Sequence, residues 1–151
     1  MKIIIINGPN LNLLGTREPE LYGSATYQDL VEFCRQSASK LGVEVDVHQS
    51  NHEGVLIELI HAARGWYDAI VINAAGYTHT SVAILDALKA VNLPVAEVHL
   101  TEPKDREEFR RFSYIGLVAE KTFSGMGFKS YSAALEYFAA KGSERNAALP
   151  L

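Results

Sequence analysis

Two pairs of side chains in this sequence have the types and spacing needed for proton transfer. Glu97 and His99 are separated by one residue, so on an extended strand both side chains point to the same face. Glu97 could orient the imidazole of His99 or hold its protonated form, and a satisfied structural pair is an equally good interpretation of this fragment. Arg17 and Tyr22 lie close together in the chain, where an arginine could favour the basic tyrosinate form of Tyr22.

The cost of making a tyrosine basic decides what else such a site needs. The pKa of a free tyrosine is near ~10, so a base active around pH 7 requires a shift of about three units, or ~4 kcal/mol. One cation at a few ångströms supplies a good part of that free energy. Arg106 or Arg110 could provide a second cation. An exposed arginine and tyrosine in a loop usually have no catalytic role, so this interpretation requires the loop to close over a site.

Arg17 and Tyr22 belong to an unusually long loop, residues 7–23. The loop follows the apolar run at residues 3–6, and it is about three times longer than the roughly 2–6 residues that connect a strand to a helix. Loops of this length are usually functional or disordered. We expect an ordered stem followed by a mobile lid, because four leucines could anchor the loop. These are Leu11, Leu13, Leu14 and Leu21.

The rest of the chain alternates strand patterns with helix patterns. Short apolar or alternating runs predict strands at residues 2–7, 43–47, 68–73, 95–100 and 117–123. Apolar residues at three- and four-residue steps predict helices at 26–41, 54–64, 81–91 and 131–140, with a short helix beginning at Pro103. Five such units predict an α/β three-layer sandwich whose parallel sheet has the order 2-1-3-4-5. We expect residues 1–141 to form a single catalytic domain and residues 142–151 a loose tail.

Composition and motifs argue against several classes of function. A net charge of −4 and a pI of about 5.7 give no reason to expect a nucleic acid or an anionic membrane surface as a partner. The single cysteine, Cys34, falls at an apolar helix position and cannot form an intrachain disulfide. No secretory signal or apolar stretch of membrane-spanning length is visible, so we expect a cytoplasmic protein. Metal-ligand spacings, phosphate loops and dinucleotide fingerprints are also missing, which argues against a metal site and against phosphate-loop or dinucleotide binding.

The expected sheet would bring the notable polar residues together. Ligands of open α/β sheets bind beyond the carboxyl ends of the strands, and polar side chains lie at these ends in four of the expected strands. They are Asn10, Arg17 and Tyr22 after the first strand, Gln49, Asn51, His52 and Glu53 after the second, Asn73 and His79 at the third, and Glu97, His99 and Thr101 at the fourth. His79 also precedes a helix start, where free N–H groups attract anions, although Thr80 or Ser81 could simply cap that helix.

Several long motifs in this chain resemble those of type II 3-dehydroquinate dehydratases, nearly from end to end. The motifs are NGPNLNLLGTREPELYG at 7–23, QSNHEG at 49–54, INAAGYTHTSVAILDAL at 72–88, EVHLTE at 97–102 and REEFRRFSYI at 106–115. The resemblance implies a flavodoxin-like fold, no cofactor, and a homo-oligomer that is a dodecamer of four trimers. It also implies a hydro-lyase of the shikimate pathway, which leads to chorismate and the aromatic amino acids. Such an enzyme converts 3-dehydroquinate to 3-dehydroshikimate and water, by anti elimination through an enolate.

The resemblance also implies catalytic roles for individual residues. Tyr22 would remove the proton from the carbon beside the ketone, and Arg17 would lower its pKa. Asn10 would hold the water that hydrogen-bonds the enolate oxygen. His99, oriented by Glu97, would protonate the departing hydroxyl group.

A second set of residues would, by the same resemblance, support the base and bind the substrate. Arg106 would help Arg17 to lower the pKa of Tyr22. Asn73, Thr101 and the backbone near Leu100 would bind the carboxylate and the leaving-group end of the substrate. His79 and Arg110 would bind ring hydroxyls. Asp86 would reach the site of a neighbouring subunit in the trimer.

Three positions depart from the family pattern. Thr101 stands where serine is usual, Leu85 where arginine is common and Ser130 where glycine is frequent. The extra methyl group of Thr101 could crowd the carboxylate pocket, and Leu85 could change a subunit contact or the partner of Asp86. None of the three removes a residue assigned to acid–base chemistry.

Two other classes of function are compatible with the fold alone. One is a flavin or small-anion binding module, but the short Ser/Thr/Gly-rich phosphate loop after the first strand is missing. The other is an inactive structural oligomer, against which the intact set of Arg17, Tyr22, Glu97 and His99 argues. The sequence does not distinguish aromatic biosynthesis from quinate breakdown, although biosynthesis is the more common role in this family.

Overall fold

The protein is built on one parallel sheet of five strands, and the computed structural model describes residues 1–16 and 18–148. The strands are β1 (Lys2–Asn7), β2 (Glu44–Gln49), β3 (Ala69–Asn73), β4 (Val95–Val98) and β5 (Lys121–Phe123). The α-helices are α1 (Pro19–Tyr22), α2 (Tyr27–Leu41), α3 (Glu53–Ala63), α4 (Val82–Val91) and α5 (Lys129–Ala148). The strand order is β2-β1-β3-β4-β5, so the predicted order 2-1-3-4-5 is confirmed.

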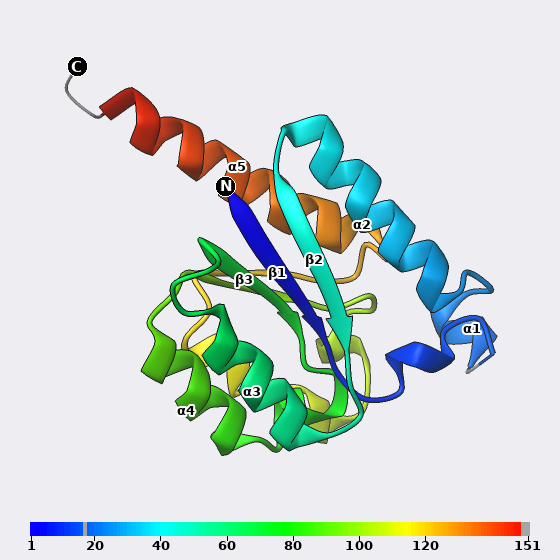
Figure 1. Ribbon diagram of the computed structural model, residues 1–151. Helices are drawn as coiled ribbons and strands as arrows, with labels where there is room; N and C mark the ends of the chain where they lie inside the picture. The colour runs from blue at the N-terminus through cyan, green and yellow to red at the C-terminus, as the bar shows by residue number, and fades with distance from the viewer. Residues whose placement is uncertain (17, 149–151) are drawn as a thin grey trace.

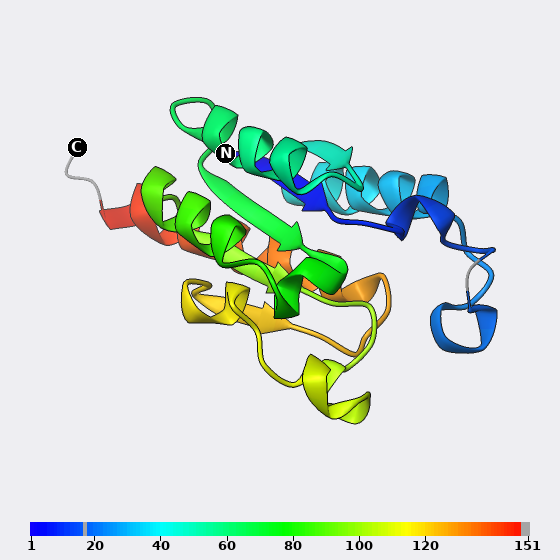
Figure 2. The ribbon, with the colours of Figure 1, turned by 90° about the horizontal axis from the view of Figure 1, so that it is seen from below.

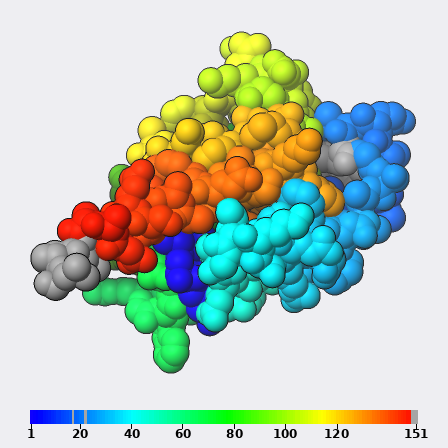
Figure 3. All heavy atoms as spheres, turned by 90° about the horizontal axis from the view of Figure 1, so that it is seen from above, coloured from blue at the N-terminus to red at the C-terminus, as the bar shows by residue number. Residues whose placement is uncertain are grey.

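Helices cover both faces of the sheet, as the predicted three-layer sandwich requires (Figures 1 and 2). Alternate residues of β1 separate the two cores: Ile3 and Ile5 pack with α2 and α5, whereas Ile4 and Ile6 pack with α3 and α4. Figure 3 shows α2 and α5 side by side along one face of the molecule. Both faces of the central strands are therefore buried, which explains why these strands read as continuous apolar runs.

Local sequence signals set the starts of the helices that flank the site. Thr26 caps α2 by accepting a hydrogen bond from the backbone N–H of Asp29, whose side chain in turn accepts from the N–H of Thr26. Ser81 caps α4 by accepting from the N–H of Ile84 at 2.9 Å. Of the two expected candidates for that cap, Thr80 and Ser81, the serine fills the role.

Two C-terminal elements differ from the expectation. Strand β5 begins at Lys121 rather than at residue 117, because Ile115–Leu117 form a 3-10 helix, η5. Helix α5 continues to Ala148 rather than ending at residue 140, so residues 142–148 of the expected tail are helical. Residues 149–151 lie outside the described part. Within this helix, Gly142 lies against the side chain of Met1, whose Cε would be 2.6 Å from a Cβ atom at position 142.

The long loop after β1 is anchored by two of its four leucines. Leu11 and Leu14 are buried, and Leu11 begins the 3-10 helix η1 (Leu11–Leu13). Leu13 and Leu21 are exposed, so the expectation that they anchor the loop is wrong. They fail as anchors because, among the described loop leucines, Leu11 and Leu14 alone join the core beneath α2 and α5.

The carboxyl ends of β1 and β3 approach each other closely. The N–H of Gly8 donates to the carbonyl of Asn73 at 2.8 Å. A Cβ atom on residue 8 would lie 2.5 Å from the carbonyl oxygen of Ala74, closer than real Cβ contacts allow. Glycine at position 8 therefore lets the loops after β1 and β3 leave the sheet side by side.

Candidate active site

A small polar cavity lies where β1, β3 and β4 end. Its volume is about 170 Å³. It is lined by Pro9, Asn10 and Leu11 after β1, by Asn73, Ala75, Gly76 and His79 at the end of β3, by His99, Leu100 and Thr101 after β4, and by Pro103, Arg106 and Arg110. The position beyond the carboxyl ends is the one expected for a ligand site in an open α/β sheet.

The structure brings together most of the site residues singled out from the sequence. Eight of them line this cavity, namely Asn10, Asn73, His79, His99, Leu100, Thr101, Arg106 and Arg110. Glu97 lies behind His99 and contacts it. Asp86 is exposed on α4 and does not belong to the described lining. Arg17 and the side chain of Tyr22 lie outside the described residues.

Glu97 and His99 form a buried hydrogen-bonded pair at the wall of the cavity. Nε2 of His99 lies 2.8 Å from Oε2 of Glu97, and the two residues are 8% and 2% exposed. Glu97 sits in the middle of the sheet, beside Ile72 of β3 and Thr122 of β5. A carboxylate accepts hydrogen bonds only, so Nε2 carries a hydrogen, and Nδ1 is the nitrogen that can gain or lose a proton. Glu97 can therefore hold the imidazole of His99 in a fixed orientation in which Nδ1 is available to act as an acid.

Two further donors hold Glu97 in its ionised form. Ser113 Oγ donates to Oε2 of Glu97, and Thr122 Oγ1 donates to Oε1 at 2.9 Å. Burial alone would raise the pKa of Glu97. The hydrogen bond and charge of His99, together with the two hydroxyl donors, outweigh burial and lower the pKa. A buried carboxylate that is fully hydrogen-bonded in this way stays charged and can stabilise a protonated His99.

Ser113 and Thr122 were not identified from the sequence as members of the site. Ser113 falls inside the motif at residues 106–115, where its position gives no sign of a contact with Glu97. Thr122 meets Glu97 because the register of β4 and β5 pairs the two residues directly. Such a pairing between strands 25 residues apart leaves no local pattern.

The ionisation of Glu97 gives the folded protein a pH-dependent stability. Because the pKa of Glu97 is lower in the folded protein than the ordinary 4.5, its contribution is complete above about pH 4.5 and is lost as the pH falls through the folded-state pKa. We expect the free energy of unfolding to fall less steeply with acidification in Glu97→Gln than in the unsubstituted protein. Urea denaturation between about pH 3 and pH 6 measures the two slopes.

The matched control for this experiment is Glu102→Gln. The carboxylate of Glu102 also has a lowered pKa, chiefly because Ser124 donates to it, but the residue is only half-buried. Its replacement should change the acid slope less, because solvent screens the charge. Equal acid slopes for Glu97→Gln and the unsubstituted protein would contradict the assignment of Glu97 as the buried carboxylate.

His79 is held as a neutral ring on another wall of the cavity. Its Nδ1 lies 2.8 Å from the carbonyl oxygen of Phe112, to which it donates. Burial lowers the pKa of His79, and nearby His99 and Arg110 lower it further, against the opposing effects of Phe112 and Glu97. A neutral ring that donates through Nδ1 keeps Nε2 as an acceptor. His79 can therefore accept a hydrogen bond from a ligand hydroxyl.

Two arginines give the cavity a positive side. Arg110 Nε donates to Oε2 of Glu107 at 2.8 Å, and Arg106 Nε lies 3.9 Å from the same oxygen. Both arginine side chains are largely buried: that of Arg106 is 16% exposed and that of Arg110 is 23% exposed. The side chain of Glu107 is 53% exposed. Both arginines belong to the described lining of the cavity. The cavity is therefore suited to an anionic ligand.

The loop after β2 supports the loop that carries Asn10. Oδ1 of Asn51 accepts from the N–H of Asn10 at 2.9 Å, and Gln49 donates to the carbonyl of Gly8 at 3.2 Å. Asn10 needs this support because it adopts a left-handed backbone with φ 71°. Of the polar residues expected at this rim after β2, Gln49 and Asn51 thus act as supports, whereas His52 and Glu53 do not line the described cavity.

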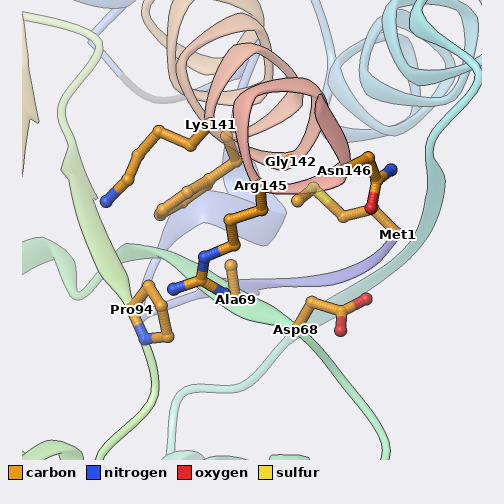
Figure 4. Close-up of a pocket in the computed structure, with 9 residues that line it drawn as sticks. Met1, Asp68, Ala69, Pro94, Lys141, Gly142, Arg145 and Asn146 are labelled. Carbon is orange, nitrogen blue, oxygen red and sulfur yellow. The ribbon is translucent and has the colours of Figure 1, made fainter. Parts of the chain in front are cut away.

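A second cavity, of about 210 Å³, lies at the opposite end of the sheet (Figure 4). It is lined by Met1, Asp68, Ala69 and Pro94 at the amino ends of the strands and by Phe138, Lys141, Gly142, Arg145 and Asn146 of α5. The described lining contains no histidine, Asp68 accepts from the N–H of Lys2, and Lys141 pairs with Glu120. The described lining of this second cavity therefore lacks a poised acid–base pair.

Neither a metal-binding cluster nor a membrane-spanning helix occurs among the described residues. Within residues 1–16 and 18–148, no group of three or more His, Cys, Asp or Glu side chains is arranged to hold a metal ion. None of the described helices has the length and the apolar character that crossing a membrane requires.

Comparison with known proteins decides the family. The model of the family described as dehydroquinase class II matches residues 1–139. The chain belongs to the class II dehydroquinase family. Within this family it is 57% identical over 134 residues to the 3-dehydroquinate dehydratase of Phenylobacterium zucineum, covering 89% of this chain and 92% of the relative. It is 51% identical over 135 residues to catabolic 3-dehydroquinase 1 of Fusarium vanettenii, covering 89% and 94%.

Solved structures of class II dehydroquinases have the same fold. The type II dehydroquinase of Butyrivibrio crossotus superposes with a TM-score of 0.88 at 43% identity, covering 91% of this chain and 96% of that one. The similarity therefore extends over most of the chain.

Proposed function

We propose that this protein is a type II 3-dehydroquinate dehydratase, a hydro-lyase that converts 3-dehydroquinate to 3-dehydroshikimate and water. The observation that carries the proposal is the buried Glu97–His99 pair at the wall of a small polar cavity that two arginines line, in a chain that belongs to the class II dehydroquinase family. The substrate is a small hydroxylated ring with a carboxylate, a ketone and a β-hydroxyl group. Its charge and its hydroxyls match the arginines and the hydrogen-bonding groups of the cavity.

The reaction begins with removal of a proton from the carbon beside the ketone. We assign this step to Tyr22 in its tyrosinate form, with Arg17 and Arg106 lowering its pKa. The proton passes to the phenolate oxygen, and the electron pair moves to the ketone oxygen to give an enolate. Asn10, which lines the cavity, would hold a water molecule that donates to this oxygen.

The second step expels the hydroxyl group. As the enolate returns to a ketone, a carbon–carbon double bond forms and the bond to the β-hydroxyl breaks. Nδ1 of His99 supplies the proton that turns the leaving hydroxide into water, while Glu97 stabilises and orients the imidazole. For anti elimination, Tyr22 and His99 must lie on opposite sides of the substrate ring. Returning the proton from Tyr22 to His99 through solvent restores the starting state.

The remaining lining residues would fix the ring between the acid and the base. We assign the carboxylate and the leaving-group end to Asn73, Thr101 and the backbone at Leu100, and the ring hydroxyls to His79 and Arg110. The neutral state of His79 supports its role, because Nε2 can then accept from a hydroxyl.

We further propose that the protein assembles as a dodecamer of four trimers. Asp86 is exposed and does not line the described cavity of its own chain, so a role at the site of a neighbouring subunit is consistent with its position. Phe112 and Leu117 are 53% and 61% exposed, and such apolar side chains are suited to burial against another copy. Size-exclusion chromatography with light scattering tests the assembly.

An absorbance assay for the conjugated enone product, with 3-dehydroquinate and no added metal, tests the proposed activity. Steady product formation is expected. A protein that leaves 3-dehydroquinate unchanged would contradict the proposal, and a yellow protein with bound flavin would instead favour a flavin-binding module. The single-domain assignment of residues 1–141, the cytoplasmic location and the role in aromatic biosynthesis stay predictions.

A further inference from the structure

We propose that Tyr131 is a positioning residue for the active site: its buried hydroxyl fixes the amide of Asn73, which presents an N–H group to the substrate. This inference rests on the proposed function for the identity of the substrate. Tyr131 lies in the first turn of α5 and does not belong to the described lining of the cavity. It would therefore act only through Asn73.

The hydrogen bonds around Asn73 leave one orientation for its amide. The backbone N–H of Ala75 is a donor and lies 3.1 Å from Oδ1 of Asn73, so the carbonyl side of the amide must face it. Nδ2 of Asn73 then donates to the hydroxyl oxygen of Tyr131 at 2.9 Å. The Tyr131 hydroxyl in turn donates to Oδ1 of Asn7 at 2.6 Å. In these three hydrogen bonds, every donor faces an acceptor, so the assigned orientation of the Asn73 amide is consistent with all of them.

This chain of hydrogen bonds is closed off from solvent. Tyr131 and Asn7 are fully buried, and Asn73 is 4% exposed. Burial raises the pKa of Tyr131 well above its ordinary value of 10.0, so the hydroxyl keeps its proton and does not act as a base. The contribution of Tyr131 is therefore orientation.

The fixed amide leaves one hydrogen of Asn73 for the ligand. Nδ2 carries two hydrogens, Tyr131 takes one, and no other described residue takes the second. Asn73 lines the cavity together with Ala75, whose left-handed backbone, with φ 51°, is tied to Asn73 by the same Asn73 Oδ1. Loss of the Tyr131 hydroxyl would leave Nδ2 of Asn73 and Oδ1 of Asn7 without a partner. The amide could then rotate, and the N–H group offered to the substrate would be lost.

The test compares Tyr131→Phe with Tyr67→Phe. Both changes remove one hydroxyl that donates a 2.6 Å hydrogen bond, but that of Tyr67 is made to Asp46, away from the described cavity. We expect Tyr131→Phe to raise KM for 3-dehydroquinate about tenfold with kcat changed less than about threefold, because a binding contact is lost and the acid and base remain. Tyr67→Phe should leave both constants unchanged even if its melting temperature falls.

A double substitution shows whether Tyr131 acts through Asn73. Adding Tyr131→Phe to Asn73→Ala should cause no further rise in KM, because the positioned group is already absent. A further tenfold rise in that background, or an unchanged KM in Tyr131→Phe, would overturn the proposal. If Tyr131→Phe does not fold, Asn7→Ala removes the acceptor of the same hydroxyl, and KM should again rise; an unchanged KM would reject the inference.

Failure of the positioning role of Tyr131 can be distinguished from failure of the proposed dehydratase activity. If the unsubstituted protein does not turn over 3-dehydroquinate, the function fails, and crystal structures then test the positioning alone. The side chain of Asn73 should leave its position in Tyr131→Phe and keep it in Tyr67→Phe. An unmoved Asn73 in Tyr131→Phe would refute the inference whatever the substrate is.

Discussion

Replacing His99 with alanine should lower kcat for 3-dehydroquinate by about 10²–10⁴-fold, the usual worth of a positioned general acid. The substrate should nevertheless continue to exchange its proton beside the ketone with solvent deuterium. The reason lies in the proposed two-step mechanism: Tyr22 and its arginines would form the enolate, whereas His99 would be needed only when the hydroxyl group leaves. Hydroxide is a poor leaving group, so the enolate would return to substrate more often than it eliminates water.

The measurement is deuterium incorporation into recovered 3-dehydroquinate, followed by mass spectrometry beside the absorbance assay. His61→Ala is the matched control, because His61 is exposed on α3, away from the described cavity, and its loss should change neither rate. Loss of both exchange and turnover in His99→Ala would indicate a binding or folding defect. Near-normal turnover would show that another group is the acid.

Replacing Tyr22 with phenylalanine should have an effect of similar size on a different step. We expect kcat to fall by about 10²–10⁴-fold while KM changes less than about threefold, because the phenol oxygen takes the proton and the ring shape is kept. In contrast to His99→Ala, exchange with solvent deuterium should also be lost, since no enolate forms. The opposite exchange behaviour of the two variants separates the base from the acid.

Tyr67→Phe again serves as the control for removing a tyrosine hydroxyl. A second check is Arg17→Gln, which removes a cation proposed to lower the pKa of Tyr22. It should move the acidic limb of the kcat profile to higher pH, because the tyrosinate would then form only at higher pH. Near-normal turnover in Tyr22→Phe would contradict the assignment of Tyr22 as the base.

Most elements of the fold could be predicted because their signals are local. The cap formed by Thr26 and Asp29 and the apolar spacing of α2 lie within a few residues of one another, so the helix begins and ends where the sequence indicates. The C-terminal helix also contacts a residue that is distant in the sequence. Helix α5 runs on past Gly142, where Met1 from the other end of the chain occupies the space beside the glycine.

The location of the candidate site could be predicted from topology, but its internal contacts could not. Parallel strands place their carboxyl ends along one edge, so residues such as Asn73 and His99 had to come close together. The donors that hold Glu97 depend on how β5 and the segment before η5 return to the sheet. Ser113 and Thr122 are separated from Glu97 by 16 and 25 residues, and no periodicity connects them.

By itself, the sequence determined the order of strands and helices, the spacing that puts Glu97 and His99 on one face, and the family resemblance. These features depend on residues close in the chain or on whole motifs, so they can be recognised in the linear sequence. The tertiary structure decided which hydroxyl groups donate to Glu97, that burial lowers the pKa of His79, and that Tyr131 accepts a hydrogen bond from Asn73. Hydrogen bonds form only within about 3 Å, and that proximity arises from strand register and helix packing between residues as far apart as Asn7 and Tyr131.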